Sequence, residues 1–528
     1  MSRVETILCC SLAVLASCAN LERQPALLME GTGSHSLPVT TRVPKAQIYF
    51  DQGLILAYGF NHDESVRSFA EAARLDPACA MAWWGQAYSL GPNMNAGMDE
   101  KRAQKASAAI RRALALAKGA SELEQDLIRA LAVRLEAPVH EDRAVIEAAY
   151  SGAMRALWRN YSDNADVGFL YADALIGETP WELWSPEFEP NFNTREALAV
   201  LERVLELDPD HPGANHFTIH AWEASGEPQR AEAAADRLGG ITPGLGHMVH
   251  MPSHIYVQVG RYADAVRCNE AGARLDREYF QRAGPQGNYY GYQAHNSHFR
   301  IWSAMYMGAY EEALDACRIL LEDLPDEMKA GPEASSWVGV EQTVHLRFGN
   351  WQAALDAPCP RQEQPYAIAL WHYARGLAFA NLKRFSEAHA EAALFEEVAG
   401  ALPNENMEFF DASQQVMNIA REMLAGEIAY LSGNPELGFE HLRLSVAAED
   451  ALHYSEPSPW MVPTRHALGA LLLEQGQVAE AEVVYRADLD RHPGNVWSLQ
   501  GLTECLERTG QEEAAALEEV AKSRNQDR

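Results

Sequence analysis

The stretch VGRYADAVRCNEAGARLD, residues 259–276, decides the fold of this chain. It opens at Gly260, a residue that lets the backbone turn sharply, and runs into a segment whose apolar residues recur every three to four positions. That periodicity predicts an amphipathic helix whose apolar face packs against the helix before the turn. The pattern therefore predicts the turn and the second helix of a helical hairpin.

The same order of residues recurs along the chain. MGAYEEALDACRILLEDLP (307–325) and QGQVAEAEVVYRADLDRHP (475–493) each place a glycine before an alanine- and glutamate-rich helix that ends in proline. Almost no stretch alternates with period two, so an all-α fold is expected. Three pairs of turns are 34 residues apart: 226 and 260, 349 and 383, 476 and 510.

In this period and residue order the sequence resembles the tetratricopeptide repeat (TPR) superfamily. The resemblance implies a right-handed α-solenoid of stacked helix-turn-helix repeats, in which the first helix of each pair lines a concave groove. Longer turn-to-turn intervals indicate loop insertions, which on a solenoid tend to lie on one face, often the binding face. The insertions lie at about 177–193, 282–294, 401–411 and 453–463.

The N-terminus has the pattern of a processing signal. An apolar run that is too short to span a bilayer ends in Leu15-Ala16-Ser17-Cys18, which resembles the lipobox of bacterial lipoproteins. The resemblance implies acylation of Cys18 and an envelope protein anchored to the outer membrane facing the periplasm; an ordinary secretory signal is the alternative. The predicted organisation is a signal peptide (1–17), a linker (18–45), a solenoid (46–522) and a tail (523–528).

Charge excludes one class of partner. The formal net charge of −31 argues against nucleic acid, whose affinity for proteins comes mainly from lysine and arginine, and against docking on an anionic membrane surface. Contact with a membrane is expected only through the lipid. Signatures of nucleotide binding, serine hydrolysis and thiolate metal sites are absent from the sequence.

Seven histidines in the middle of the chain carry the one pattern that points to chemistry. They recur at matching distances before the turns of successive hairpins, and within a helix they are spaced i, i+3 or i, i+4, on one face. Imidazoles that share a space are common ligands of transition metals. The predicted ligands are His216, His220, His247, His250, His254, His295 and His298.

Neighbouring packed helices lie about 8–10 Å apart, and a metal–imidazole bond is about 2.0–2.1 Å long, so side chains from two first helices can meet at one ion. Pro252 indicates a helix boundary, which makes His247 and His250 less secure ligands than His216, His220 and His254. Copper is favoured because Met248 and Met251 are interleaved with the histidines, and zinc is the close alternative.

Whether such a metal is catalytic stays open. With three or so histidines bound, a coordination position is left for water or substrate, and Glu223 is the candidate general base. The aromatic residues expected to shape and cover the pocket are Trp181, Trp184, Tyr289, Tyr290 and Tyr292.

Three functions compete. One is a metalloenzyme that acts on a small molecule or peptide in the groove. Another is a non-catalytic scaffold that binds a protein partner, as TPR proteins commonly do, and the third is metal storage or delivery. Histidines that merely form hydrogen bonds in a polar groove are the alternative to any metal.

Overall fold

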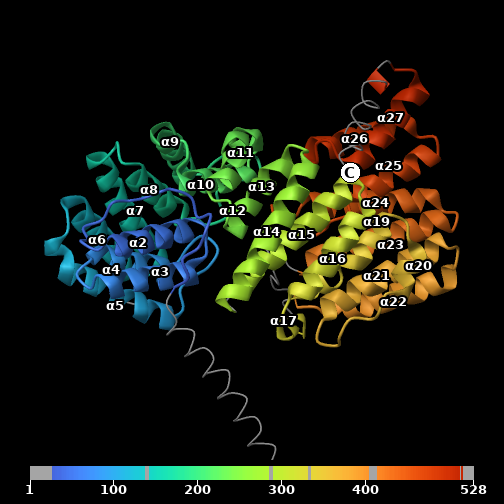
Figure 1. Ribbon diagram of the computed structural model, residues 1–528. Coiled ribbons are helices and arrows are strands. Elements are labelled where there is room, and N and C mark those ends of the chain that lie inside the picture. The colour runs from blue at the N-terminus through green and yellow to red at the C-terminus, as the bar shows by residue number, and fades with distance from the viewer. Residues whose placement is uncertain are drawn as a thin grey trace, which may run out of the picture. The chain divides into compact units, whose positions relative to one another are not determined.

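The computed structural model describes residues 26–136, 142–284, 289–330, 334–403, 413–511 and 513–514. In these ranges the chain consists of helices and connecting turns, with two isolated bridges and no β-strand. Successive helices pair as hairpins, such as α2 (Pro44–Tyr58) with α3 (His62–Leu75) (Figure 1). The predicted all-α fold of paired helical hairpins is confirmed.

The described residues form two compact units, and the predicted solenoid over residues 46–522 includes residues of both. Unit 1 comprises the described residues up to Gly226 together with Asp236–Met248 and Tyr279–Tyr289. Unit 2 comprises Glu227–Ala235, Val249–Glu278 and the described residues from Tyr290 onward. A repeat period identifies which helices pair, but it does not show how many hairpins share one core.

The helices of unit 1 surround the first group of histidines. They are α2 and α3, α4 (Ala80–Leu90), α5 (Glu100–Leu116), α6 (Glu122–Leu135), α7 (Arg143–Asn160), α8 (Ala165–Ile176), α9 (Phe192–Leu207) and α10 (Pro212–Glu223). Three helices begin in one unit and end in the other: α11 (Glu232–Ile241), α12 (Gly246–His250) and α14 (Tyr262–Ala283).

Unit 2 contains most of the C-terminal hairpins. Its helices are α13 (Pro252–Gln258), α14 (Tyr262–Ala283, up to Glu278), α15 (Tyr290–Met307), α16 (Tyr310–Asp323), α17 (Asp326–Ala330), α18 (Ser335–Val338), α19 (Val340–Arg347), α20 (Trp351–Asp356), α21 (Pro365–Asn381), α22 (Phe385–Gly400), α23 (Ser413–Leu431), α24 (Pro435–Asp450), α25 (Thr464–Glu474), α26 (Val478–Arg491) and α27 (Val496–Thr509).

Eight hairpin turns share one backbone geometry. Each first helix ends with a residue in the left-handed region, and the next N–H donates to the carbonyl five residues back, as Arg261 does to Tyr256 at 2.7 Å. Glycine adopts this conformation without strain, whereas other residues incur roughly 1–2 kcal/mol. The turn residues are Phe60, Gly260, Gly308, Gly349, Lys383, Gly433, Gly476 and Gly510.

Substitution of one turn glycine tests this geometry. Gly476 has a φ of +75°, and a Cβ added there would meet nothing within 4 Å, so Gly476→Ala isolates the conformational cost. We expect its free energy of unfolding in urea to fall by about 1 kcal/mol. Gly400→Ala, at the end of α22 and equally open, is the matched control and should leave stability unchanged or raise it by a few tenths of a kcal/mol. Equal losses in both variants would contradict the turn assignment.

The segment before α2, predicted to be part of a linker, packs against unit 1. Ala26 and Leu37 are buried, and the carbonyl of Gly31 accepts a hydrogen bond from the N–H of Gly244 at 2.8 Å. The expected signal peptide and Cys18 lie outside the described residues. None of the described helices combines the length and the apolar character that crossing a bilayer requires.

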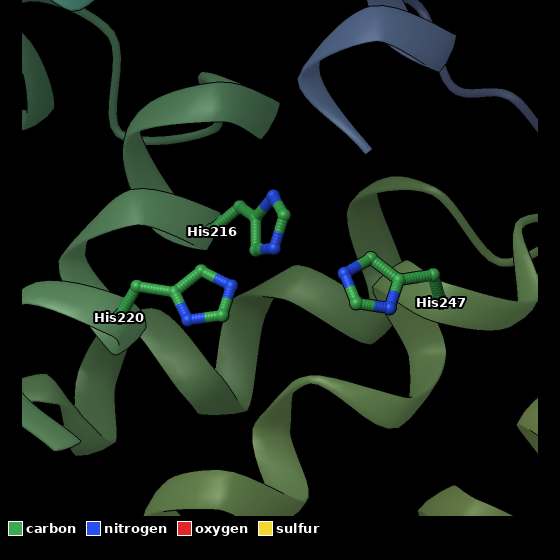
Figure 2. A group of neighbouring side chains, drawn as sticks. All are labelled: His216, His220 and His247. Carbon is green, nitrogen blue, oxygen red and sulfur yellow. The ribbon is translucent and has the colours of Figure 1, made fainter. Parts of the chain in front are cut away.

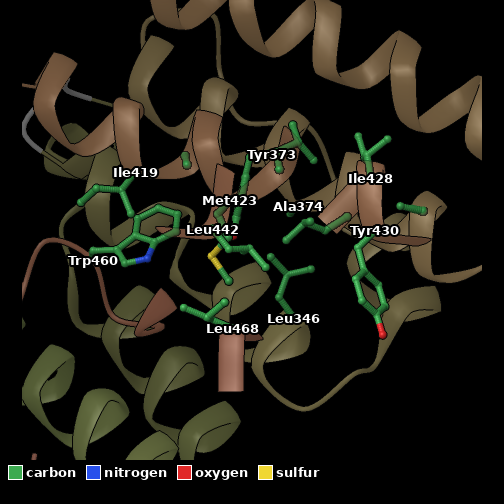
Figure 3. Packing of buried hydrophobic residues seen from close by; sticks show 14 of the residues in the cluster. Leu346, Tyr373, Ala374, Ile419, Met423, Ile428, Tyr430, Leu442, Trp460 and Leu468 are labelled. Carbon is green, nitrogen blue, oxygen red and sulfur yellow. The ribbon is translucent and has the colours of Figure 1, made fainter. Parts of the chain in front are cut away.

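Unit 2 has a continuous apolar core along its hairpins (Figure 3). Tyr373 of α21 packs edge-on against Trp460 at a centroid distance of 5.3 Å, and Met423 and Leu442 are buried beside the same cluster. Trp460 belongs to the predicted insertion 453–463, which is therefore folded into the core on one side.

Candidate metal centres

Six of the seven predicted histidines form two groups of three, one in each unit. In each group the three residues offer ligand atoms that all lie within 4.8 Å of one another. Site one consists of His216, His220 and His247 in unit 1. Site two consists of His250, His254 and His295 in unit 2.

Two helices of unit 1 build site one. His216 and His220 lie one turn apart on α10, and His247 projects toward them from α12 (Figure 2). The ring centroid of His216 is 4.8 Å from that of His220 and 5.1 Å from that of His247. All three side chains are buried, at 0, 3 and 3% exposure, so the space that they share is shielded from solvent.

Hydrogen bonds select the tautomers of His216 and His220. His216 Nδ1 lies 2.6 Å from the Tyr58 carbonyl oxygen, which can only accept, so Nδ1 carries the proton. His220 Nδ1 lies 3.0 Å from Glu223 Oε1 and donates in the same way. Each Nε2 therefore holds a lone pair. An imidazole anchored through Nδ1 to a carbonyl or carboxylate is the usual arrangement of a metal-binding histidine.

Two aromatic residues in unusual backbone conformations border site one. The ring centroid of Phe60 lies 4.6 Å from that of His216, 5.6 Å from that of His220 and 5.4 Å from that of His247. Trp181 packs edge-on against His220 at 5.7 Å. Both have left-handed φ angles, of 60° and 67°. Phe60 occupies a turn position that is glycine in six other hairpins, and strain of this kind is common where function fixes a side chain.

Site two is built from three helices of unit 2. His250 ends α12, His254 lies in the first turn of α13, and His295 lies on α15. His254 Nε2 is 2.9 Å from His250 Nε2 and 3.5 Å from His295 Nε2. The helix boundary predicted at Pro252 is present, and proline stands at the start of α13, where a helix tolerates it. His247 and His250, the two ligands that this boundary made less secure, each belong to one of the two groups.

The partners of His250 and His254 lie on the Nδ1 side of each ring. His254 Nδ1 is in ion-pair contact with Glu456 Oε2, at 2.6 Å. His250 Nδ1 lies 2.5 Å from Asn269 Oδ1, and Asn269 Nδ2 donates to the Ala265 carbonyl, so Oδ1 is the acceptor that faces the ring. His250 Nε2 and His254 Nε2 face each other at 2.9 Å, a distance at which one ring donates to the other or both bind one cation.

The distances suit a tetrahedral metal. Bonds of about 2.0–2.1 Å at tetrahedral angles separate two ligand nitrogens by roughly 3.3 Å. The separations at site two, 2.9 and 3.5 Å, bracket that value. A tetrahedral metal held by these three imidazoles would keep one position for water or substrate.

His298 lies apart from both groups. It is buried on α15, one turn beyond His295, and it lines a cavity of unit 2. Burial lowers the pKa of its imidazole to about 4, so the ring is neutral at physiological pH. The sequence predicted that seven histidines converge, but i, i+3 spacing alone did not reveal that His298 faces a separate space.

The other predicted site residues have structural partners. Glu223, the candidate general base, accepts a hydrogen bond from the ring of His220. Trp184 Nε1 donates to the Ala221 carbonyl at 2.8 Å. Tyr289 packs edge-on against Tyr279 in unit 1, while Tyr290 and Tyr292 are half-buried in the first turn of α15. Among these, Trp181 is the aromatic residue that packs against a predicted ligand.

A third polar group lies beside site one and was not predicted. Asp166 Oδ1 accepts from His35 Nε2 at 2.9 Å and from the Tyr58 hydroxyl at 2.8 Å, and His211 Nε2 lies 3.4 Å away. His211 Nδ1 accepts from the Ala214 N–H, so its proton is on Nε2 and faces the carboxylate. The group is a hydrogen-bond network centred on Asp166, in which His211 Nε2 approaches the carboxylate without forming a hydrogen bond in the described part of the chain. His35 is 131 residues from Asp166 in the sequence, so the spacing of neighbouring residues could not predict this contact.

This network makes stability depend on pH. Burial lowers the pKa of His35, but the hydrogen bond and charge of Asp166 outweigh it and raise the pKa. A raised folded pKa means that the stabilisation is fully present below the unfolded value of 6.5 and is lost as pH rises through the folded pKa. We expect His35→Gln to reduce the fall in unfolding free energy between pH 6 and pH 9. The exposed His389→Gln is the control, and equal slopes in wild type and His35→Gln would contradict the assignment.

Comparisons with known proteins give weak matches. No protein-family model and no curated protein matches the sequence. Among solved structures, a human IFIT1 dimer with PPP-AAAA is 11% identical, with 91% of each chain covered and a TM-score of 0.33. The APC/C hetero-tetramer Cut9–Hcn1 is 13% identical over 87% of this chain and 76% of that chain, with a TM-score of 0.32. Yeast Tom70 is 9% identical over 89% of this chain and 90% of that chain, with a TM-score of 0.30. No function follows from similarity at this level.

Proposed function

We propose that this chain is a transition-metal protein in which a TPR-like scaffold holds two three-imidazole centres. The observation that supports it best is the convergence of three imidazoles in each group, with ligand atoms within 4.8 Å of one another and with His250 Nε2 and His254 Nε2 2.9 Å apart.

The two sites differ in how far their ligands are exposed to solvent, and we therefore propose different roles for them. The ligands of site one are buried, whereas His295 of site two is half-buried. Closed metal sites are typically structural, and sites that keep an accessible coordination position are typically catalytic. We therefore assign chemistry on a small molecule or peptide to site two and stabilisation to site one. In this assignment Glu223 positions His220.

Copper and zinc are the candidate metals, since three imidazoles suit both. The methionines that favoured copper are fully buried, and Met248 packs against Gly59 in unit 1. They fill the core, so they give copper no preference over zinc.

The proposal includes export and lipid attachment through Cys18, on the sequence pattern alone. Labelled palmitate should be incorporated into the chain in bacterial cells, and Cys18→Ser should abolish the label. Label that persists in Cys18→Ser would contradict the anchor and leave the metal proposal untouched.

Metal content of the purified chain tests the central claim. Elemental analysis should find close to two equivalents of copper or zinc, and one equivalent should be lost in His216→Ala/His220→Ala and one in His250→Ala/His254→Ala. His441→Ala is the control, because that ring is bound to Glu422 outside both sites. A chain that binds neither metal after dialysis against both, or double variants that retain two equivalents, would refute the proposal.

A further inference from the structure

Unit 2 contains a cavity of about 510 Å³ that the metal proposal does not use. Its walls come from the first helices of successive hairpins, α19, α21, α23 and α25, and from the loop between α24 and α25. Apolar and aromatic side chains make up most of the lining, among them Leu370, Tyr373, Met423 and Trp460; Figure 3 shows the last three. This size and character are those of a small-molecule site.

One cation in the cavity has no carboxylate beside it. The guanidinium of Arg347 lies over Trp497, 4.0 Å from the ring centroid, and its Nη2 atom is buried without a hydrogen-bond partner in the described part of the chain. Trp497 is itself held by a hydrogen bond from its Nε1 to the Met305 carbonyl. Burial lowers the pKa of Arg347 to about 10, which leaves it charged at neutral pH.

The acidic residues near Arg347 form no ion pair with it in the described part of the chain. Asp488 Oδ2 accepts from His466, Ser498 and Asn495, and the charge of Asp488 raises the pKa of Arg347. Burial raises the pKa of Glu427, the carboxyl in the lining, to about 7. A half-buried guanidinium whose Nη2 lacks a partner among the described residues can bind the anionic group of a ligand.

We propose that this cavity binds a small organic acid with an apolar body. The carboxylate pairs with the Arg347 guanidinium, and the aliphatic or aromatic part fills the space between Tyr373, Met423 and Trp460. Guanidinium matches a carboxylate with two parallel hydrogen bonds, and the apolar wall favours the uncharged remainder of the molecule.

Two segments of the chain carry residues of both the cavity and site two. Glu456, which anchors His254, precedes the cavity residues Ser458 and Trp460 in one loop, and His298 of the cavity follows the metal ligand His295 on α15. We therefore assign the acid as the substrate class of site two, a step that rests on the proposed metal function. Binding of the acid by the cavity does not depend on metal.

Calorimetric titration of the full chain with dodecanoate and with dodecanol tests the inference. Dodecanoate should bind the wild type, and Arg347→Gln should weaken its binding about 10- to 100-fold while leaving the weaker binding of dodecanol unchanged. Arg384→Gln, an exposed arginine of the same unit, is the matched control. Leu370→Trp, which fills the cavity and keeps Arg347, should weaken both ligands.

Several outcomes would overturn the assignment. They are equal affinity for the acid and the alcohol, no effect of Arg347→Gln on dodecanoate, or no binding to the wild type. Tighter binding of an apolar peptide through its C-terminal carboxylate would replace the small acid with a peptide. Titrations are made with metal-free and zinc-loaded protein. Acid binding by metal-free protein in a chain that takes up no metal would support the cavity and refute the metal proposal.

Discussion

Zinc binding at site two should weaken by more than about 100-fold when His254 is replaced by alanine. His254 Nε2 is the central atom of the site, 2.9 Å from one partner nitrogen and 3.5 Å from the other, so its loss leaves two ligands that lack their common neighbour. Removal of residues that merely orient metal ligands typically costs 10- to 100-fold in affinity, and loss of a ligand should exceed that.

The measurement is a competition titration against a zinc chelator in the His216→Ala/His220→Ala background, where site two is the remaining site. His298→Ala is the control, because His298 is a buried histidine of the same region that lies outside the site. Glu456→Gln should give an intermediate loss, since the amide lacks the negative charge that lies beside His254 Nδ1. An affinity for zinc that is the same in His254→Ala and His298→Ala would rule out site two.

Metal loading should also raise the free energy of unfolding, by about 4 kcal/mol for each site at which free zinc is 1,000 times the dissociation constant. The reason is that the ligands of site one come from α10 and α12, and the ring of His216 is held by the backbone of α2. An ion bound there joins three segments that separate on unfolding, so it stabilises the folded state alone.

Urea unfolding followed by far-ultraviolet circular dichroism, with saturating zinc and with chelator, measures the effect. The gain should fall in His216→Ala/His220→Ala and vanish when the site-two histidines are replaced as well. Identical unfolding curves with zinc and with chelator in the wild type would show that the imidazole groups bind no ion.

The sequence predicted the fold well because each hairpin repeats a local signal. The turn glycines and the apolar period of residues 259–276 are properties of neighbouring residues, and helix pairing follows from them. The left-handed turn at Phe60 shows the limit of that signal. That Phe60 takes the place of a turn glycine can be recognised only from the geometry of the turn and from its contacts with three histidine rings.

The histidine pattern predicted which side chains gather but not how they divide. His216 and His220 share a helix face, so their proximity follows from spacing. The division into two sites depends on α12, which places His247 in one unit and His250 in the other. The anchoring partners Tyr58, Asn269 and Glu456 are distant in sequence from the rings they hold, and single-sequence reasoning has no means of finding them.

The packed N-terminal segment limits how far the folded part of the protein could lie from a membrane if Cys18 carried a lipid. Folded contacts begin by Ala26, so a lipid on Cys18 would be joined to unit 1 by eight residues, which extend to about 28 Å at most. If Cys18 carries a lipid as proposed, an anchored copy would stay within that distance of the bilayer, and its encounters with membrane-bound partners would depend on lateral diffusion.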